Sequence, residues 1–354
     1  MKTLALTPWP IYPAQSGGQE RCWNLLSRIG EVTVFSLDWQ GNSTHQRIGE
    51  VNYKVVPADD AAIIQSKKLM ASGIQTFDPM PMLTKDNLVT IRKEIDNSDP
   101  DLIILEHPWM LDLIEDRPYI YDSHNCETLL TRQQRPHSLD FPLVKDLERR
   151  ATQQAEHMTY TSNDDLKHMK QLYPFTTPTT LIPNGVTIPE HRATGEELNL
   201  IFVGSLYAPN LQAAQQLIAL APLLSEYKIR IIGGCTQLLD NKYDNVELIG
   251  QVTDKQLDYY MRTSFAFINL TGMGSGTQLK VGRALSYGLP VISTALGARG
   301  YTSPLHVIPA YVPDMLTQVR KRWHHFSDLA YEEALTMTWD EIAGNYKQVI
   351  NGLQ

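Results

Sequence analysis

Short apolar and β-branched runs alternate with longer amphipathic stretches along the first half of the chain. The runs that predict buried strands lie at 2–7, 31–37, 52–57, 101–107 and 119–125. Helical periodicity is found at 17–30, where Gly30 predicts the end of the helix, and again at 138–158. The segment 61–95 is also helical in composition, but Pro79 and Pro81 interrupt it. Strand, helix and strand in this order predict a parallel sheet with crossover helices.

Residues 179–197, TTLIPNGVTIPEHRATGEE, combine Pro-Asn-Gly with a polar run, which is typical of a linker. Beyond this segment the same alternation restarts. Strands are predicted at 198–204, 228–234, 246–250, 265–270 and 290–294. Helices are predicted at 210–224, 254–263 and 277–288. Two consecutive α/β units predict two doubly wound domains that face each other across a cleft.

Composition places the chain among ordinary globular proteins. Its 354 residues are 42% hydrophobic and 20% charged, with a net charge of −8, which argues against a nucleic-acid surface along the whole chain. The apolar runs are interrupted by charge well before the roughly 20 residues of a membrane span, and the N-terminus has no signal-peptide pattern. Three widely spaced cysteines, Cys22, Cys126 and Cys235, lack metal-type spacing. We therefore expect free thiols, no metal site and a cytoplasmic location.

A glycine-rich loop at 272–277 follows the predicted strand 265–270 and precedes the predicted helix 277–288. Backbone amides at such a helix start, the Thr277 hydroxyl and the Lys280 ammonium group together suit an anion, and diphosphate is the natural ligand. The next strand leads to a second loop, and we expect its Gly297 and Ala298 to lie beside the first. The alternative is a tight glycine turn with no ligand.

Several stretches, in order, resemble the family 4 glycosyltransferases. The segment GSGTQLKVGRALSYGLPVISTALGARGY resembles the donor-binding segment of that family, and PIYPAQSGGQER resembles its N-terminal glycine loop. YDSHNCE, TSNDDL, LIPNGV, FVGSLYAPNLQAA and TWDEIAGNY are similar to further family segments, so that the resemblance spans nearly the whole chain. It implies the GT-B fold, an α/β architecture of two facing Rossmann-like domains. Residues 1–185 with a returning helix at 340–354 would form the acceptor-side domain, and residues 195–338 the donor domain.

The same resemblance implies a retaining enzyme that takes a sugar from a nucleotide diphosphate sugar to a hydroxyl acceptor, with no metal or other cofactor. Gly17, Gly18 and Arg21 would lie near the donor phosphate and the acceptor, and His124 would position the sugar. Alternatively, the hydrogen-bonding needs of the His124 side chain are met within its own turn by Asp122 or Glu127. The donor-binding residues implied by the resemblance also include Gly204, Ser275, Gly276, Thr277, Lys280 and Arg283.

Two positions depart from the family pattern, because Ser275 and Arg283 stand where the family has glutamates. The second glutamate normally holds the ribose hydroxyls of the nucleotide, and an arginine cannot accept a hydrogen bond. An unusual donor, a ribose held by another group and a noncatalytic binding homologue all remain open. A nicotinamide-dependent dehydrogenase shares this architecture but is disfavoured, because no Gly-x-Gly-x-x-Gly opens the first βα turn.

The acceptor is poorly specified by the sequence. Asn125, Glu127, Arg132 and Arg135 are acceptor-side candidates, and Lys145, Arg149 and Arg150 extend a basic stretch that would suit an anionic acceptor. A lipid phosphate, a glycan and a nucleic-acid strand are all compatible with this stretch, and so is a solvated helix face without a ligand. A second basic cluster lies at 320–326. The amphipathic segment 61–74 would allow peripheral contact with a membrane, but packing inside the first domain is favoured.

Overall fold

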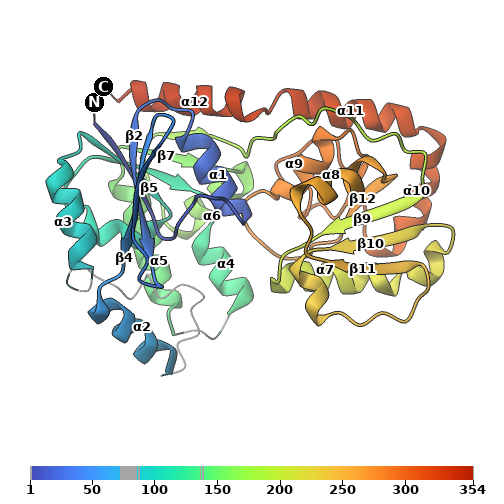
Figure 1. The fold of residues 1–354 in the computed structure, drawn as a ribbon, viewed down its shortest axis with the longest axis horizontal. Coiled ribbons are helices and arrows are strands. Elements are labelled where there is room, and N and C mark those ends of the chain that lie inside the picture. The colour runs from blue at the N-terminus through green and yellow to red at the C-terminus, as the bar shows by residue number, and fades with distance from the viewer. Residues whose placement is uncertain (1, 72–85, 87, 136, 138, 354) are drawn as a thin grey trace. The chain divides into compact units, whose positions relative to one another are not determined.

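The computed structural model describes residues 2–71, 86, 88–135, 137 and 139–353, and Figure 1 shows their fold. The chain divides into two compact units. Unit 1 comprises Met1–Pro183 and Ile342–Gln354, and unit 2 comprises Asn184–Glu341. Each unit is built on its own sheet, so the predicted α/β fold with two Rossmann-like domains is confirmed.

Unit 1 contains an eight-stranded sheet in the order β3-β4-β2-β1-β5-β6-β7-β8. The strands are β1 (Thr3–Thr7), β2 (Val32–Asp38), β3 (Thr44–Ile48), β4 (Val51–Pro57), β5 (Leu102–Glu106), β6 (Tyr119–Ser123), β7 (His157–Tyr160) and β8 (Thr179–Leu181). Its helices are α1 (Gly17–Leu26), α2 (Asp60–Ala71), α3 (Val89–Ser98), the 3₁₀ turn η2 (Pro108–Leu113), α4 (Glu127–Gln134), α5 (Phe141–Gln154) and α6 (Asn163–Leu172). All neighbouring strands are parallel except β3 and β4, which form an antiparallel hairpin.

Unit 2 contains a fully parallel six-stranded sheet in the order β11-β10-β9-β12-β13-β14. Its strands are β9 (Asn199–Val203), β10 (Lys228–Ile232), β11 (Val246–Gly250), β12 (Ala266–Asn269), β13 (Val291–Ser293) and β14 (Leu305–His306). Its helices are α7 (Ala208–Ala219), η3 (Ala221–Leu224), η4 (Gly234–Leu238), α8 (Asp254–Arg262), α9 (Leu279–Ser286), η5 (Pro309–Tyr311), α10 (Val312–Lys321) and α11 (Trp323–Leu335). The last helix, α12 (Trp339–Asn351), begins in unit 2, and its residues from Ile342 onward belong to unit 1.

Parallel strands covered on both faces are mainly apolar, and the central strands of the two sheets follow this rule. All residues of β5, LIILE, are buried, and the first four residues of β9, NLIFV, are buried as well. Separate hydrophobic cores surround the two sheets. In each sheet the strand order reverses beside the first strand of the unit, between β1 and β5 in unit 1 and between β9 and β12 in unit 2. Ligand sites of parallel sheets lie beyond the carboxyl ends of the strands at such points.

Three local predictions need correction. The helix predicted at 138–158 ends at Gln154, and residues 157–158 already belong to β7, where Met158 is fully buried. The predicted linker 179–197 begins with a strand, because residues 179–181 pair with β7 as β8. Strand β3, THQRI, was not predicted, because its polar residues are largely exposed and carry no apolar alternation.

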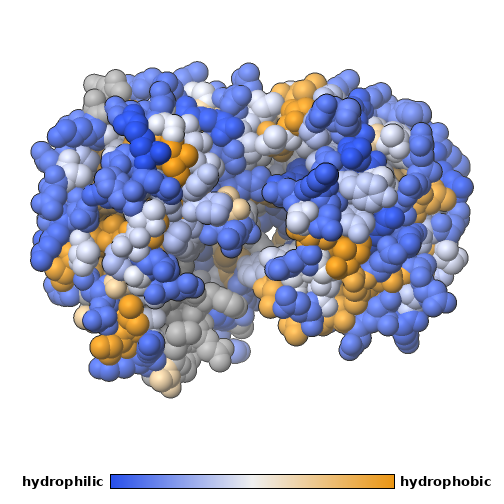
Figure 2. Space-filling view, in the orientation of Figure 1, coloured by the Kyte–Doolittle hydropathy of each residue, from blue (hydrophilic) through white to orange (hydrophobic). Residues whose placement is uncertain are grey.

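The amphipathic segment 61–74 forms α2 as far as Ala71, where Ala62 is buried and Ile64 is exposed. Residues 72–74, Pro79 and Pro81 lie outside the described residues. Within the described part of the chain, every helix is too short or too polar to cross a lipid bilayer. Figure 2 shows a mainly hydrophilic face with hydrophobic side chains in small groups. The exposed apolar residues of unit 2 include Leu206, Leu223 and Leu238.

Candidate functional site

The glycine-rich loop of unit 2 joins the buried strand β12 to α9. Gly274 and Gly276 have φ values of +142° and +69°, which residues with side chains rarely adopt. A Cβ atom built on Gly272 or on Gly274 would meet no described atom within 4 Å. The loop therefore needs glycine for its backbone course, and it leaves open space beside these two residues.

The second glycine loop packs directly on the first, as the sequence predicts. Arg299 donates from Nε to the Gly276 carbonyl oxygen at 2.8 Å, and Thr294 donates to the Thr271 carbonyl oxygen at 2.5 Å. A Cβ on Gly297 would lie 2.7 Å from Asn269 Nδ2, and Ala298 is buried directly after it. The close packing of the second loop on the end of β12 therefore depends on a glycine at position 297.

A residue of the predicted linker fixes the start of α9. Asn184 is buried and donates from Nδ2 to Thr277 Oγ1 at 2.8 Å and to the Thr277 carbonyl oxygen at 3.3 Å. The Gln278 side chain makes no cap for α9; its Oε1 atom instead accepts from Asn269 Nδ2 at 3.0 Å. The helix therefore starts without a side-chain cap, and its positive dipole end is available to an anion.

Lys280 lies in the first turn of α9 and is held by neutral groups. Its Nζ atom donates to Asn210 Oδ1 at 2.7 Å and lies 4.3 Å from the centre of the Phe202 ring. Burial lowers the pKa of Lys280 to about 7. Among the described residues no carboxylate pairs with this half-buried ammonium group. A half-buried cation without an anionic partner is a specific feature of a ligand site.

The remaining donor-side candidates lie in the same unit but differ in environment. Ser275 and Arg283 are half-buried, the first in the loop and the second one turn beyond Lys280 in α9. Gly204 is buried, and its amide donates to the Ile232 carbonyl oxygen at 2.9 Å. A Cβ on Gly204 would lie 2.9 Å from Asn210 Cβ. Gly204 therefore allows close packing around Asn210, and its backbone amide already donates to a carbonyl oxygen of the protein.

In unit 1, Gly17 and Gly18 form the start of α1, with Ser16 as the N-cap residue. Gly17 is exposed and Gly18 is half-buried. A Cβ on Gly18 would lie 4.0 Å from His124 Nδ1 and 4.0 Å from Trp9 Cζ2. The structure therefore brings Gly18 and His124 together at the carboxyl end of the unit 1 sheet.

The partner of His124 is Glu106 rather than the two carboxylates considered from the sequence. His124 Nε2 lies 2.6 Å from Glu106 Oε2, whereas Asp122 Oδ2 is 3.7 Å away, and Glu127 pairs with His107 instead. Burial, followed by the charge of Asp122, raises the pKa of Glu106 to about 8, and burial lowers the pKa of His124 to about 4. The raised pKa of Glu106 and the lowered pKa of His124 both favour the neutral forms, an arrangement in which Glu106 donates to His124 Nε2.

Arg21, implied as a catalytic residue, is an interior group of unit 1. Its side chain is 1% exposed, and its guanidinium group lies 2.8 Å from Asp122 Oδ1 and 2.9 Å from the Ile182 carbonyl oxygen. Burial disfavours ionisation of Asp122, but Arg21 and the hydrogen bonds to the carboxylate outweigh it and lower the pKa of Asp122. Arg21 therefore acts by stabilising the cluster that carries His124, because no exposed surface is left for a ligand.

His107 is a further site residue that sequence reasoning missed. It follows β5 with φ +69° and ψ 160°, a region that is essentially reserved for glycine. Its Nδ1 atom lies 3.1 Å from Glu127 Oε1, and its ring centre lies 4.1 Å from that of His124. Its buried Nε2 atom has no hydrogen-bond partner in the part of the chain that the structure describes. The only sequence signal is its place at the end of an apolar strand, one residue before Pro108.

The acceptor-side candidates mostly have structural partners. Asn125 donates from Nδ2 to Glu127 Oε1 at 3.2 Å, and buried Glu148 accepts from the Glu127 amide at 2.6 Å. Arg135 pairs with Asp140 at 2.8 Å, while Arg132 is exposed on α4. In the basic cluster 320–326, the Trp323 indole points inward and donates to the Phe265 carbonyl oxygen.

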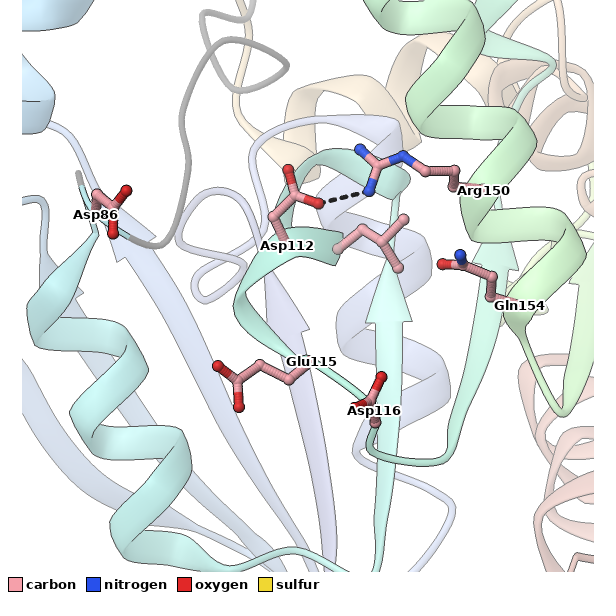
Figure 3. Close-up of a pocket in the computed structure, with 7 residues that line it drawn as sticks. Asp86, Asp112, Glu115, Asp116, Arg150 and Gln154 are labelled. Atoms are coloured by element: carbon pink, nitrogen blue, oxygen red, sulfur yellow. Dashed lines mark hydrogen bonds and ion pairs between the residues drawn. The ribbon is translucent and has the colours of Figure 1, made fainter.

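One residue of the predicted basic stretch, Arg150, lines an acidic pocket of about 350 Å³ in unit 1. Arg150 donates to Asp112 and also bonds Asp146, and Arg149 pairs with Asp146 as well. Figure 3 shows Arg150 and Asp112 joined, with Asp86, Glu115 and Asp116 around the same pocket. The pocket beside Arg150 is therefore mainly negative in charge, and Arg150 and Arg149 already have carboxylate partners.

Comparison with known proteins agrees with this architecture. Residues 22–188 match the family model described as Glycosyltransferase Family 4, and residues 197–318 match the one described as Glycosyl transferases group 1. A search of the curated proteins by sequence finds no match. The chain is therefore a glycosyltransferase of the GT-B fold class. Within that class it belongs to the glycosyltransferases that combine a family 4 domain with a group 1 domain.

Solved structures share the fold at low sequence identity. Sucrose-phosphate synthase from Thermosynechococcus elongatus is 15% identical, with a TM-score of 0.78 over 100% of this chain and 99% of that one. Anabaena HepE in complex with UDP and glucose is 12% identical, with a TM-score of 0.68 over 99% of both chains. The trehalose-phosphate synthase from Burkholderia xenovorans, bound to glucose-6-phosphate, is 10% identical, with a TM-score of 0.69 over 99% of this chain and 100% of that one.

Replacing Arg21 tests its interior role. Arg21→Met should lower the free energy of unfolding of unit 1 by about 3 to 5 kcal/mol, because Asp122 would remain buried without its cation. Exposed Arg28, just beyond the end of α1, is the matched control, and Arg28→Met should change stability by about 0.5 kcal/mol or less. Urea unfolding followed by circular dichroism measures both. Unchanged stability of Arg21→Met together with lost activity would instead support a direct catalytic role.

Proposed function

We propose that this glycosyltransferase binds a nucleotide diphosphate sugar through the start of α9 and transfers the sugar with retention of configuration. The observation that carries the proposal is Lys280, a half-buried ammonium group whose described partners, Asn210 and Phe202, are neutral. A diphosphate would supply the missing negative charge. The uncapped helix start would add backbone amides and its positive dipole end.

The nucleotide part of the proposal is supported by the structural neighbours. Anabaena HepE has been solved with UDP and with UDP-glucose, and a trehalose-6-phosphate protein from E. coli has been solved with UDP-2-fluoro glucose. These proteins share the fold of this chain, and the open side of Gly272 and Gly274 gives their type of ligand room beside the loop. Lys280 and the helix start provide positive charge at the phosphates, so the proposal needs no metal ion there.

The proposed reaction is balanced without a cofactor. The bond between the anomeric carbon and the donor phosphate oxygen breaks, and the acceptor hydroxyl oxygen forms the new bond on the same face of the sugar. The leaving phosphate takes the proton of that hydroxyl. The protein would orient the reactants and stabilise the charge that develops on the diphosphate, and the proposed contribution of unit 1 is His124, which presents Nδ1 beside Gly18.

The proposal is tested with UDP-glucose as the first probe, followed by GDP-, ADP- and dTDP-glucose. We expect saturable binding of one of them by calorimetry, and a product whose anomeric configuration matches the donor by NMR on a panel of hydroxyl acceptors. Binding without turnover on any acceptor or water would favour a binding protein. An inverted product would contradict the retaining part of the proposal.

Lys280→Met should weaken binding of the nucleotide sugar by about 1 to 3 kcal/mol, because it removes one charge-assisted hydrogen bond to the diphosphate. Methionine keeps the side chain over Phe202 without the charge. Lys255→Met is the matched control, since Lys255 is an exposed lysine of unit 2 in α8. Equal affinities for Lys280→Met and wild type in titration calorimetry would refute the assignment of Lys280.

The pH dependence of binding follows from the lowered pKa of Lys280, about 7 in the free protein. A bound diphosphate favours the ammonium form and raises that pKa, so affinity should be greatest below pH 7. Between pH 7 and 9 it should fall by up to about tenfold per pH unit. UDP-glucose is suitable because its diphosphate stays fully ionised over this range. Lys280→Arg, which stays charged, should bind with little pH dependence; a slope that persists in this variant would assign the titration to another group.

Arg283 is proposed to set donor preference in place of the family glutamate. Arg283→Glu should change the relative affinities of UDP, GDP and ADP, because a carboxylate can accept hydrogen bonds from ribose hydroxyls and a guanidinium group cannot. Arg283→Met removes the positive charge without adding a hydrogen-bond acceptor, so it separates the effect of the new carboxylate from that of losing the charge. Identical nucleotide profiles for wild type and both variants, measured by calorimetry, would exclude a role for position 283 in donor choice.

A further inference from the structure

Three separate elements of unit 1 bring a thiol, a carboxylate and an imidazole nitrogen together in the interior. Cys22 lies on α1, Glu106 ends β5, and His124 follows β6. Cys22 Sγ lies 3.4 Å from Glu106 Oε2 and 3.9 Å from His124 Nε2, and these last two atoms lie 2.6 Å apart. All three side chains are buried, with exposed fractions of 1%, 0% and 7%.

We propose that unit 1 binds one zinc ion through Cys22 Sγ, Glu106 Oε2 and His124 Nε2. Thiolate, imidazole and carboxylate are the ligand types that zinc prefers in proteins. Tetrahedral zinc with bonds of about 2.0 to 2.3 Å separates its ligand atoms by about 3.4 to 3.6 Å. The two distances from sulfur are already close to these values. The distance between Glu106 and His124 must lengthen by under about 1 Å when the metal replaces the hydrogen between them.

Unsatisfied oxygen atoms at the same place are an independent indication of a cation. Among the described residues, Glu106 Oε1 and Asp122 Oδ2 have no hydrogen-bond partner, although both side chains are fully buried. Leaving such an oxygen without a donor is costly in a protein interior. Asp122 Oδ2 lies 3.7 Å from His124 Nε2, so a cation bound at this nitrogen would also offset the charge of Asp122.

The charges in this cluster suit a divalent ion. Metal binding requires the thiolate and carboxylate forms of Cys22 and Glu106, and their two negative charges neutralise Zn²⁺. Asp122 is separately compensated by Arg21, whose guanidinium group lies 2.8 Å from Asp122 Oδ1. A buried metal site whose charges sum to about zero avoids the penalty of an isolated buried charge.

Such an ion would connect α1, β5 and β6 beneath the candidate site. It would hold His124 through Nε2 and leave Nδ1 toward Gly18, where a Cβ would lie 4.0 Å from that nitrogen. The chain spacing of the three ligands gives no metal motif, because they lie 84 and 18 residues apart along the sequence. The site is therefore visible only in the folded structure, and it does not depend on the proposed sugar transfer.

The test uses full-length protein freed of metal by a chelator and then titrated with Co²⁺ and Zn²⁺. We expect one Co²⁺ per chain with a thiolate-to-cobalt charge-transfer band in the near ultraviolet, displacement of that band by Zn²⁺, and a higher melting temperature with Zn²⁺. Cys22→Ala should abolish the band and weaken Zn²⁺ binding by at least about 100-fold, since the loss of an outer partner alone costs 10- to 100-fold. Cys126→Ala is the matched control, because it also removes a buried thiol from unit 1.

Glu106→Gln, which keeps the shape of the side chain, provides a second variant in case Cys22→Ala fails to fold by circular dichroism. It should keep the cobalt–thiolate band but weaken Zn²⁺ binding at least about tenfold. The proposal is overturned if wild-type protein shows no thiolate band with Co²⁺. It is equally overturned if Cys126→Ala loses the band while Cys22→Ala keeps it, or if neither Cys22→Ala nor Glu106→Gln weakens Zn²⁺ binding.

Discussion

A half-buried ammonium group without a described carboxylate partner is the constraint on which the functional account depends. Lys280 is anchored by Asn210 and Phe202, and partial burial holds its pKa near 7. Such an arrangement does not stabilise the folded protein by itself, because the charged form has lost water and gained only neutral partners. An anionic ligand would supply the negative charge that Lys280 lacks, and the adjacent start of α9 gives the ligand a place to bind.

The two sheets place different chemistry at equivalent positions. In unit 2 the strand order reverses between β9 and β12, and the loops there are rich in glycine and lie near Lys280. In unit 1 the reversal between β1 and β5 carries a buried polar cluster built around Asp122, Glu106 and His124. The first arrangement suits an anion that enters from solvent. The second fixes the orientation and protonation of an imidazole through groups that solvent does not reach.

The sequence predicted the element order, both sheets and the adjacency of the two glycine loops, because each depends on local pattern and on general rules for parallel sheets. It also gave Lys280 and His124 as candidate site residues. It did not reveal that Glu106 is the partner of His124, that Arg21 is buried against Asp122, or that Asn184 holds Thr277. These contacts join residues 18, 101 and 93 positions apart, so no local spacing encodes them. The conformation of His107 depends on the same tertiary context.

The most direct measurement of the central claim is an experimental structure of the protein with bound UDP. The account predicts that a diphosphate oxygen lies within about 3 Å of Lys280 Nζ and that phosphate oxygens accept from backbone amides at the start of α9. A structure with the phosphates elsewhere on the protein, and with Lys280 still directed only at Asn210 and Phe202, would contradict it.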